Sequence, residues 1–197
     1  RFQIVDDVWF RRRAADLNHQ GVLVECHARE LADEQSLKEA WPKLGECPLI
    51  LVLDGITDPR NLGACLRTAN AAGVDAVILP KRNSAPLSAV ALKTSQGGAE
   101  GLFIVQVINL ARCLTWLRKQ GVWLLGADGD GEQIWHAMDS SVPLALVMGS
   151  EGKGLRRLTR SLCDQLVSIP MRGAVESLNV AVATGILLFE VMRQRSE

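Results

Sequence analysis

Residues 49–79 have the sequence LILVLDGITDPRNLGACLRTANAAGVDAVIL. It contains two apolar runs, LILVL and DAVIL, with the segment NLGACLRTANAAG between them. This segment predicts a helix that ends at Gly73, because a left-handed residue is favoured directly after a helix. Apolar residues fill each run without regular alternation, so the runs predict strands that are buried on both faces. Such strands are typical of a parallel sheet covered by helices.

The same pattern continues to the end of the chain. Four further apolar runs are LFIVQV, VWLLGA, LALVMG and QLVSIP, and a second helical segment, NLARCLTWLRKQG, ends at Gly121. Strands alternating with helices predict an α/β domain with a mostly parallel sheet and helices on both faces. The segment from Val180 to Met192 is apolar around much of its circumference. It predicts a helix that is buried on several sides, either in its own core or against a partner chain.

Residues 1–46 lack this regular pattern and are charged. The run GVLVEC at 21–26 is consistent with one strand. The acidic stretch after it predicts a helix over residues 30–41, whose buried positions are Leu31, Leu37, Ala40 and Trp41.

The charges of the chain balance, since Lys plus Arg number 22 and Asp plus Glu number 22. A neutral chain has no bulk attraction for nucleic acid, so any such binding has to come from local basic clusters. Candidate clusters, each more often plain solvated surface, are Arg11–Arg13, Lys81–Arg82, Arg156, Arg157 and Arg160. The longest apolar run, VAVATGILLFEVM, is interrupted by Glu190 and is too short to span a bilayer, so no membrane partner is expected.

The cysteines and histidines of the chain give no pattern of disulfides or of metal ligands. The five cysteines are widely spaced and form no Cys-x-x-Cys pair. An odd number without metal-like spacing predicts buried, reduced thiols in a cytoplasmic protein. The three histidines form no ligand pattern, so no metal site is expected.

Ligands of parallel α/β sheets bind beyond the carboxyl ends of the strands. The polar turns that follow the predicted strands are DGITDPRNLG, GADGDGE, GSEGKG and PMRGAVESLN. The two glycine-rich turns do not have the G-x-G-x-x-G spacing of a dinucleotide site. GSEGKG is also not a phosphate-binding P-loop, because Lys153 is followed by Gly154 rather than by Ser or Thr. A dehydrogenase or an NTPase is therefore poorly supported.

Single residues in these turns are candidates for a site, each with a structural alternative. The carboxylate of Glu151 would repel a phosphate and suits an arginine or a cationic ligand, or else it caps the next helix. Arg67 is a lone long cation in a helix of small residues, although most helical arginines are simply exposed. Asn61 can cap that helix, after a turn at Asp58–Pro59.

Two polar residues precede the last helix. Ser177 is a good N-cap because its hydroxyl can accept a hydrogen bond from an amide two or three residues on. Asn179 is a poor helix former, and it lies where first-turn amides can meet a ligand. The alternative for Asn179 is a tolerated residue in the first turn.

Three blocks, DPRNLGACLRTANAAG, LALVMGSEGKGL and IPMRGAVESLNVAVATGI, resemble in order and spacing the three motifs of the SpoU (TrmH-like) RNA ribose methyltransferases of the SPOUT class. The resemblance covers about residues 48–195 and is closest to bacterial enzymes that act on 23S ribosomal RNA. It implies methylation of a guanosine 2′-hydroxyl with S-adenosylmethionine (AdoMet), a homodimer, and a trefoil knot near the C-terminus. Transfer RNA as the substrate, or a noncatalytic RNA-binding relative, are the alternatives.

The resemblance also implies the roles of individual residues. The catalytic set is Asn61, Arg67, Glu151, Ser177 and Asn179, and the cofactor-binding set is Gly149, Ile169, Met171 and Leu178. A guanidinium with a pKa above about 12 rarely gives up its proton. We therefore expect Arg67 to bind a phosphate and to stabilise the developing alkoxide, and Glu151 to orient Arg67.

Many members of this family carry an N-terminal substrate-binding domain that is similar to a ribosomal protein. The tripeptide HQG at 19–21 resembles the end of that domain. We therefore expect residues 1–28 to be its remnant in a chain shortened at the N-terminus, residues 29–46 to be a linker with a helix, and residues 47–197 to be the methyltransferase domain.

Overall fold

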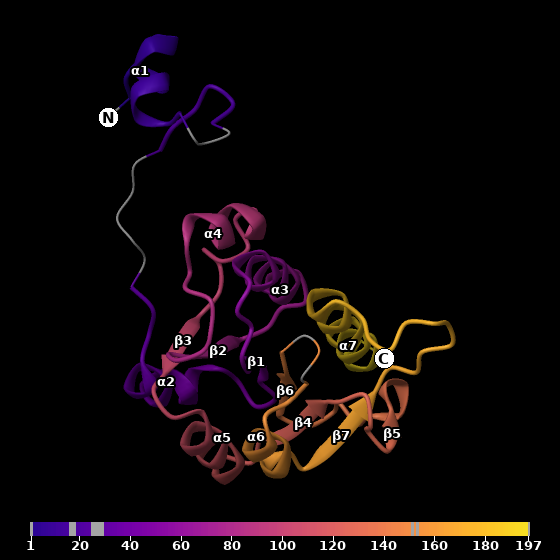
Figure 1. Ribbon diagram of the computed structural model, residues 1–197. Coiled ribbons are helices and arrows are strands. Elements are labelled where there is room, and N and C mark those ends of the chain that lie inside the picture. Colours follow the sequence, from indigo (N-terminus) through magenta and orange to yellow (C-terminus); the bar gives the residue numbers. More distant parts are fainter. Residues whose placement is uncertain (1, 16–18, 25–29, 151, 153, 197) are drawn as a thin grey trace. The chain divides into compact units, whose positions relative to one another are not determined.

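A computed structural model gives the fold of this chain and describes residues 2–15, 19–24, 30–150, 152 and 154–196 (Figure 1). Contacts between residues divide the chain into two compact units, Arg1–Glu30 and Leu31–Glu197. The second unit contains the sheet and the candidate site.

The first unit contains one short helix, α1 (Asp7–Arg13). Asp6 caps it, since its side chain accepts a hydrogen bond from the amide of Trp9 at 2.8 Å. The predicted strand at 21–26 is not found in residues 21–24, where Val22 and Val24 are exposed, and residues 25 and 26 lie outside the described residues. A single apolar run without a neighbouring strand has no partner for its backbone hydrogen bonds.

The second unit is built on a parallel sheet with the strand order β3-β2-β1-β6-β4-β7-β5. The strands within the described residues are β1 (Leu49–Leu53), β2 (Ala76–Pro80), β3 (Ile104–Val107), β4 (Trp123–Ala127), β5 (Gln133–Ile134), β6 (Leu144–Met148) and β7 (Gln165–Ser168). Leu51 in the inner strand β1 pairs with Val77 of β2 on one side and with Leu146 of β6 on the other. The predicted α/β fold with a mostly parallel sheet is confirmed. The two-residue β5 is too short to give a pattern in the sequence. The trefoil knot near the C-terminus stays a prediction.

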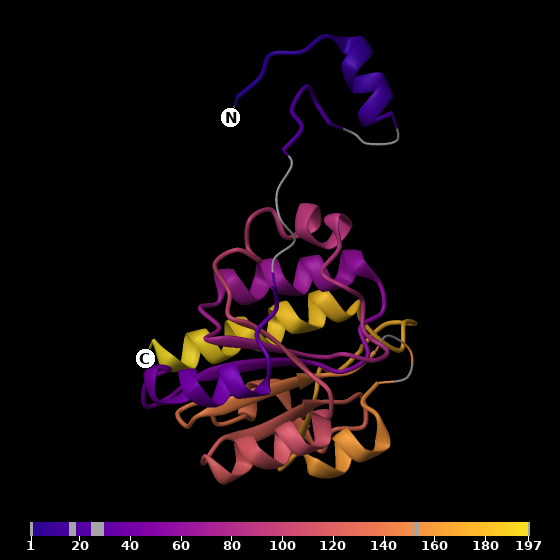
Figure 2. The ribbon, with the colours of Figure 1, turned by 90° about the vertical axis from the view of Figure 1, so that its left-hand side faces the viewer.

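Helices cover both faces of the sheet, as predicted. They are α2 (Glu34–Ala40), η1 (Trp41–Lys43), α3 (Pro59–Ala71), α4 (Ala89–Ser95), α5 (Leu110–Lys119), η2 (Trp135–Ala137), α6 (Arg157–Leu162) and α7 (Val180–Arg195). Figure 2 shows α3 and α7 on one face and α5 and α6 on the other. Neighbouring residues of β1 point to different cores: Leu51 packs with α3 and α7, whereas Ile50 packs with α2 and α5.

The helix predicted over residues 30–41 is shorter in the structure. It begins at Glu34, because the side chain of Asp33 accepts a hydrogen bond from the amide of Ser36 at 2.8 Å. Before it, Ala32 extends the sheet as an isolated parallel bridge to Val105. Leu37 is buried as predicted, but three expected core positions are only half-buried, namely Leu31, Ala40 and Trp41.

Helix α4 was not predicted, since seven residues give no helical apolar pattern. Close contact with α3 holds it in place. A Cβ atom on Gly63 would lie 2.4 Å from the carbonyl oxygen of Ala91, so only glycine permits this approach of the two helices.

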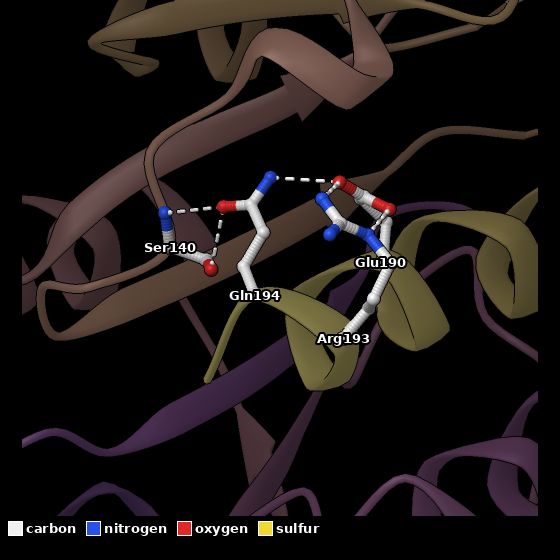
Figure 3. Close-up of polar contacts among 4 residues, drawn as sticks. All are labelled: Ser140, Glu190, Arg193 and Gln194. Carbon is white, nitrogen blue, oxygen red and sulfur yellow. Dashed lines mark hydrogen bonds and ion pairs between the residues drawn. The ribbon is translucent and has the colours of Figure 1, made fainter. Parts of the chain in front are cut away.

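A network of polar side chains fixes the C-terminal helix α7 (Figure 3). The buried carboxylate of Glu190 accepts hydrogen bonds from the guanidinium of Arg193 at 2.8 and 2.9 Å and from the amide of Gln194 at 2.8 Å. Oε1 of Gln194 in turn accepts from the hydroxyl of Ser140 at 2.8 Å. These contacts tie the last turns of α7 to the loop that precedes β6.

The Glu190 network predicts acid sensitivity. The hydrogen bonds from Arg193, followed by that from Gln194, lower the pKa of Glu190 from 4.5 to about 2. A carboxyl with a lowered pKa stabilises the fold fully above its unfolded pKa, and this stabilisation is lost as the pH falls towards 2. We expect Glu190→Gln to be about 1–2 kcal/mol less stable than the wild type at pH 7.

The measurement is urea unfolding at several pH values. The wild type should lose stability between pH 4.5 and pH 2, and Glu190→Gln should lose less over that range, with the exposed Glu100→Gln as the control variant. Equal pH dependence of Glu190→Gln and the wild type would contradict this assignment.

The described cysteines are free thiols that differ in burial. Cys65 and Cys113 are buried as predicted, but Cys47 and Cys163 are only half-buried, because both lie in connecting segments rather than in the core of an element. Desolvation raises the pKa of Cys113 and of Cys163 to about 12. Cys26 lies outside the described residues. Among the residues that the structure describes, every helix is too short or too polar to span a membrane. The same part of the chain contains no cluster of His, Cys, Asp and Glu side chains that could bind a metal ion.

Candidate active site

A cavity of about 670 Å³ lies at the carboxyl ends of β4, β6 and β7 and beside the beginning of α7. Its walls come from residues 127–130, from the loop after β6, from the end of β7 and from the loop that leads into α7. Three of the four turns picked out in the sequence therefore contribute to it. The volume is in the range of small-molecule and cofactor sites.

The structure gathers the predicted cofactor-binding residues around this cavity. Gly149, Ile169, Met171 and Leu178 all line it, although the first lies after β6 and the other three come after β7. Ser177, from the predicted catalytic set, lines it too. Their individual roles stay predictions.

The loop after β6 folds back on itself, with Ser150 and Gly154 side by side. The amide of Ser150 donates to the carbonyl of Gly154 at 3.0 Å, and the amide of Gly154 donates to the carbonyl of Ser150 at 2.9 Å. Gly149 has no room for a side chain, because a Cβ atom there would lie 2.2 Å from the carbonyl carbon of Gly154. Glu151 lies outside the described residues.

The loop before α7 places Ser177 on the cavity wall, whereas Asn179 caps the helix. Oδ1 of Asn179 accepts a hydrogen bond from the amide of Ala181 at 2.9 Å, and α7 starts at Val180. The prediction that Ser177 is the N-cap is therefore wrong, because the helix begins two residues later than that prediction required. The exposed Ser177 is left to face the cavity.

Asn61 and Asn179 meet although they are far apart in the sequence. Nδ2 of Asn179 donates to Oδ1 of Asn61 at 2.9 Å. The prediction that Asn61 caps α3 is wrong: Asp58 is the N-cap and accepts from the amide of Arg60 at 2.8 Å. Asn61 is instead within the first turn of α3, where its side chain reaches the start of α7. The first and third motifs thus touch.

Arg67 is exposed in the second half of α3. Because a helix turns about 100° per residue, it lies on a different side of α3 from Asn61. The backbone of Gly98 packs closely against that of Arg67, since a Cβ atom at position 98 would lie 2.8 Å from Cα of Arg67. Arg67 is not among the residues that line the cavity, and its guanidinium pairs with no described residue. One chain therefore leaves the predicted catalytic arginine outside the cavity.

Two carboxylates near the carboxyl edge were missed in the sequence. Asp128 lines the cavity and forms an ion pair with Arg160 at 2.9 Å, and the fully buried Asp54 forms one with Arg156 at 3.3 Å. Each lies directly after an apolar strand, which is the signal that could have identified them. Both arginines were candidates for RNA contacts, and the structure gives them partners within the protein.

Comparisons with known proteins agree with the three motifs. A family model described as the SpoU rRNA Methylase family matches residues 48–189. A curated relative from Pseudomonas putida, named 23S rRNA (guanosine-2'-O-)-methyltransferase RlmB, is 53% identical over 177 residues, which are 90% of this chain and 71% of the relative. The protein of the same name from Shewanella oneidensis is 51% identical over 183 residues, 93% of this chain and 74% of the relative.

Solved structures have the same fold. The SpoU methyltransferase AviRb from Streptomyces viridochromogenes, in complex with AdoMet, matches with a TM-score of 0.73 and 31% identity over 78% of this chain and 60% of its own. The TrmH/SpoU tRNA modifying enzyme of A. aeolicus matches with a TM-score of 0.70 and 30% identity over 83% of this chain and 84% of its own. This chain thus spans less than two thirds of the AviRb chain and most of the other. With a family model that covers residues 48–189, the chain belongs to the SpoU rRNA methylase family.

Proposed function

We propose that this protein transfers a methyl group from AdoMet to the 2′-hydroxyl of a guanosine ribose in 23S ribosomal RNA. The observation that carries the proposal is the single cavity lined by Gly149, Ile169, Leu178 and Ser177, next to the contact between Asn61 and Asn179. Two relatives that are 53% and 51% identical to this chain over the aligned residues are named as enzymes of this activity. An enzyme with this substrate works in the cytoplasm, which is the location we propose.

The residues around the cavity fit AdoMet. Ile169, Met171 and Leu178 offer an apolar surface for a purine ring, and the backbone around Gly149 offers hydrogen-bonding groups. Related structures with this fold contain AdoMet, including AviRb and an rRNA methyltransferase from Sinorhizobium meliloti. When bound, AdoMet supplies an activated methyl group on a sulfonium.

The polar residues of the motifs would position the ribose. Oδ1 of Asn61 already accepts a hydrogen bond from Asn179. The Nδ2 group of Asn61 makes no hydrogen bond with the described residues, so this group is the one that can donate to the ribose oxygen. Ser177 offers a hydroxyl from the wall of the cavity. Alignment of this kind lowers the activation barrier of methyl transfer, because the ribose oxygen and the methyl carbon are already held in the geometry of the reaction.

Arg67 would stabilise the negative charge that develops on the ribose oxygen. Its guanidinium stays protonated at neutral pH, so it acts by charge and hydrogen bonds rather than by accepting the proton. Glu151 would orient it by an ion pair.

A second copy of this chain would complete the site. Val182 and Phe189 are 52% and 50% exposed on α7, and their spacing of seven residues puts them on one side of the helix. An apolar helix face of this kind is covered in a dimer, and a dimer can also bring Arg67 of one copy to the cavity of the other. Sedimentation equilibrium should give twice the 21.5 kDa of one chain; a monomer at micromolar concentration would contradict the dimer.

The experiment that tests the function uses AdoMet with a tritiated methyl group and 23S ribosomal RNA that lacks ribose methylation. We expect label in the RNA, and digestion to nucleosides should recover it as 2′-O-methylguanosine. Transfer RNA is the parallel substrate. Label in transfer RNA alone, or on a base, would overturn the proposal.

A further inference from the structure

Asp54 is a buried acid that the mechanism above does not use. It follows β1 directly, and its side chain is fully buried. Oδ2 accepts a hydrogen bond from the hydroxyl of Thr159 at 2.7 Å, and Oδ1 lies 3.3 Å from Nε of Arg156. A carboxylate without solvent is costly unless it is paired, so these two contacts hold it in place.

The partners of Asp54 stand at the two ends of one loop. Its backbone amide donates to the carbonyl of Met148, the last residue of β6, at 2.8 Å. Arg156 is the N-cap residue of α6, and Thr159 lies in its first turn. Asp54 therefore contacts the point where the loop leaves β6 and the point where it enters α6.

This loop supplies a large part of the cavity wall. The described residues that it contributes are Gly149, Ser150, Gly152, Gly154 and Leu155. The backbone hydrogen bonds between Ser150 and Gly154 bring the two sides of the loop together. Asp54 contacts both the residue before the loop, Met148, and the start of α6 after it. Gly55, next to Asp54, has a φ of 84° and lies against the same arginine, since a Cβ atom there would be 3.4 Å from Nη2 of Arg156.

We propose that Asp54 is a positioning residue that holds the described residues of this loop, Gly149, Ser150, Gly154 and Leu155, in the arrangement required to bind AdoMet. The carboxylate of this ion pair is fully buried, whereas the Arg156 side chain is 44% exposed. Such a pair is a weak source of stability compared with apolar packing, but it fixes one arrangement of the chain segments that it joins. The inference deepens the proposed function and rests on it, because the ligand of the loop is AdoMet.

The test compares Asp54→Asn with the wild type. We expect the Kd for AdoMet, measured by calorimetry, to rise about ten-fold, as when the binding-competent loop falls to about a tenth of the population. The KM for AdoMet should rise in parallel, while kcat at saturating AdoMet and the KM for RNA change little. Hydrogen exchange in peptides that contain Ser150 and Gly154 should become faster in Asp54→Asn.

Asp164 provides a matched control. It is a nearly buried acid that pairs with Arg118 at 2.7 Å and accepts from the amide of Leu124 at 2.9 Å, near the amino ends of β4 and β7. Asp164→Asn loses an ion pair of the same kind and should keep the wild-type Kd for AdoMet.

Two milder variants keep the proposal testable if Asp54→Asn does not fold. Thr159→Val removes one hydrogen bond, and Arg156→Lys keeps the charge but changes its geometry; both should bind AdoMet more weakly than Asp164→Asn does. Folded variants at Asp54, Arg156 and Thr159 with wild-type AdoMet affinity and unchanged exchange would overturn the proposal. If the wild type itself does not bind AdoMet, the proposed function fails, and faster exchange in Asp54→Asn would still support the role of Asp54 in the loop.

Discussion

Replacing Arg67 with alanine is expected to abolish methyl transfer while AdoMet still binds. Arg67 lies outside the residues that line the cavity, so its loss leaves the cofactor site intact. Removal of a group that stabilises a developing oxyanion typically lowers kcat by about 10²- to 10³-fold. Arg67→Lys should recover little activity, because lysine has the charge but not the two-pronged geometry that fits a phosphate.

The measurements are single-turnover methyl transfer and calorimetric AdoMet binding. Arg60→Ala, at another exposed arginine of the same helix, is the control and should keep its kcat. Unchanged turnover in Arg67→Ala would reject the role of this residue.

Replacing Gly149 with alanine is expected to weaken AdoMet binding, which Arg67→Ala leaves intact. The added Cβ atom would lie 2.2 Å from the carbonyl carbon of Gly154, so the loop after β6 has to move. Overpacking of this kind costs about 1–3 kcal/mol, which is equivalent to a Kd for AdoMet that is about 5- to 150-fold higher. Calorimetry measures the affinity, and circular dichroism shows whether the sheet remains folded.

Gly173→Ala is the matched control for Gly149→Ala. A Cβ atom at position 173 meets nothing within 4 Å, so this variant should bind AdoMet as the wild type does. Wild-type affinity in Gly149→Ala would mean that the cofactor does not use the loop after β6.

The two variants together also test whether the site is shared between subunits. If Arg67 of one copy serves the cavity of the other, a mixed dimer of Arg67→Ala and Gly149→Ala contains one intact site. Coexpression should then restore part of the activity that each variant alone lacks. If both residues act within one chain, each subunit of the mixed dimer carries one defect, and activity stays absent.

The sheet could be predicted from the sequence because each central strand, such as LILVL, is apolar along its whole length. The glycines at 73 and 121 likewise marked the ends of α3 and α5, and both have positive φ angles. Helix α4 left no such pattern, because its position depends on a close approach at Gly63 rather than on its own apolar face. Local sequence patterns thus predicted the elements whose own apolar residues are buried, and they did not predict an element that depends on one close contact.

Contacts between distant residues could not be predicted in the same way. Whether Asn61 caps its own helix or bonds to Asn179 depends on where α7 starts, and the sequence suggested a start too early by two residues. The link from Asp54 to Thr159 joins residues 105 positions apart. Neither residue has a spacing that indicates its partner, so only the folded chain reveals the pair.

A crystal structure of the protein with AdoMet bound is the most direct test of the proposed active site. We expect the ligand in the cavity, against Gly149, Ile169 and Leu178. Asn61 and Asn179 should lie beside its methyl group, with Arg67 of one of the two subunits within reach. A ligand bound elsewhere, or an Arg67 far from Asn179 and Gly149 in every pairing of subunits, would contradict it.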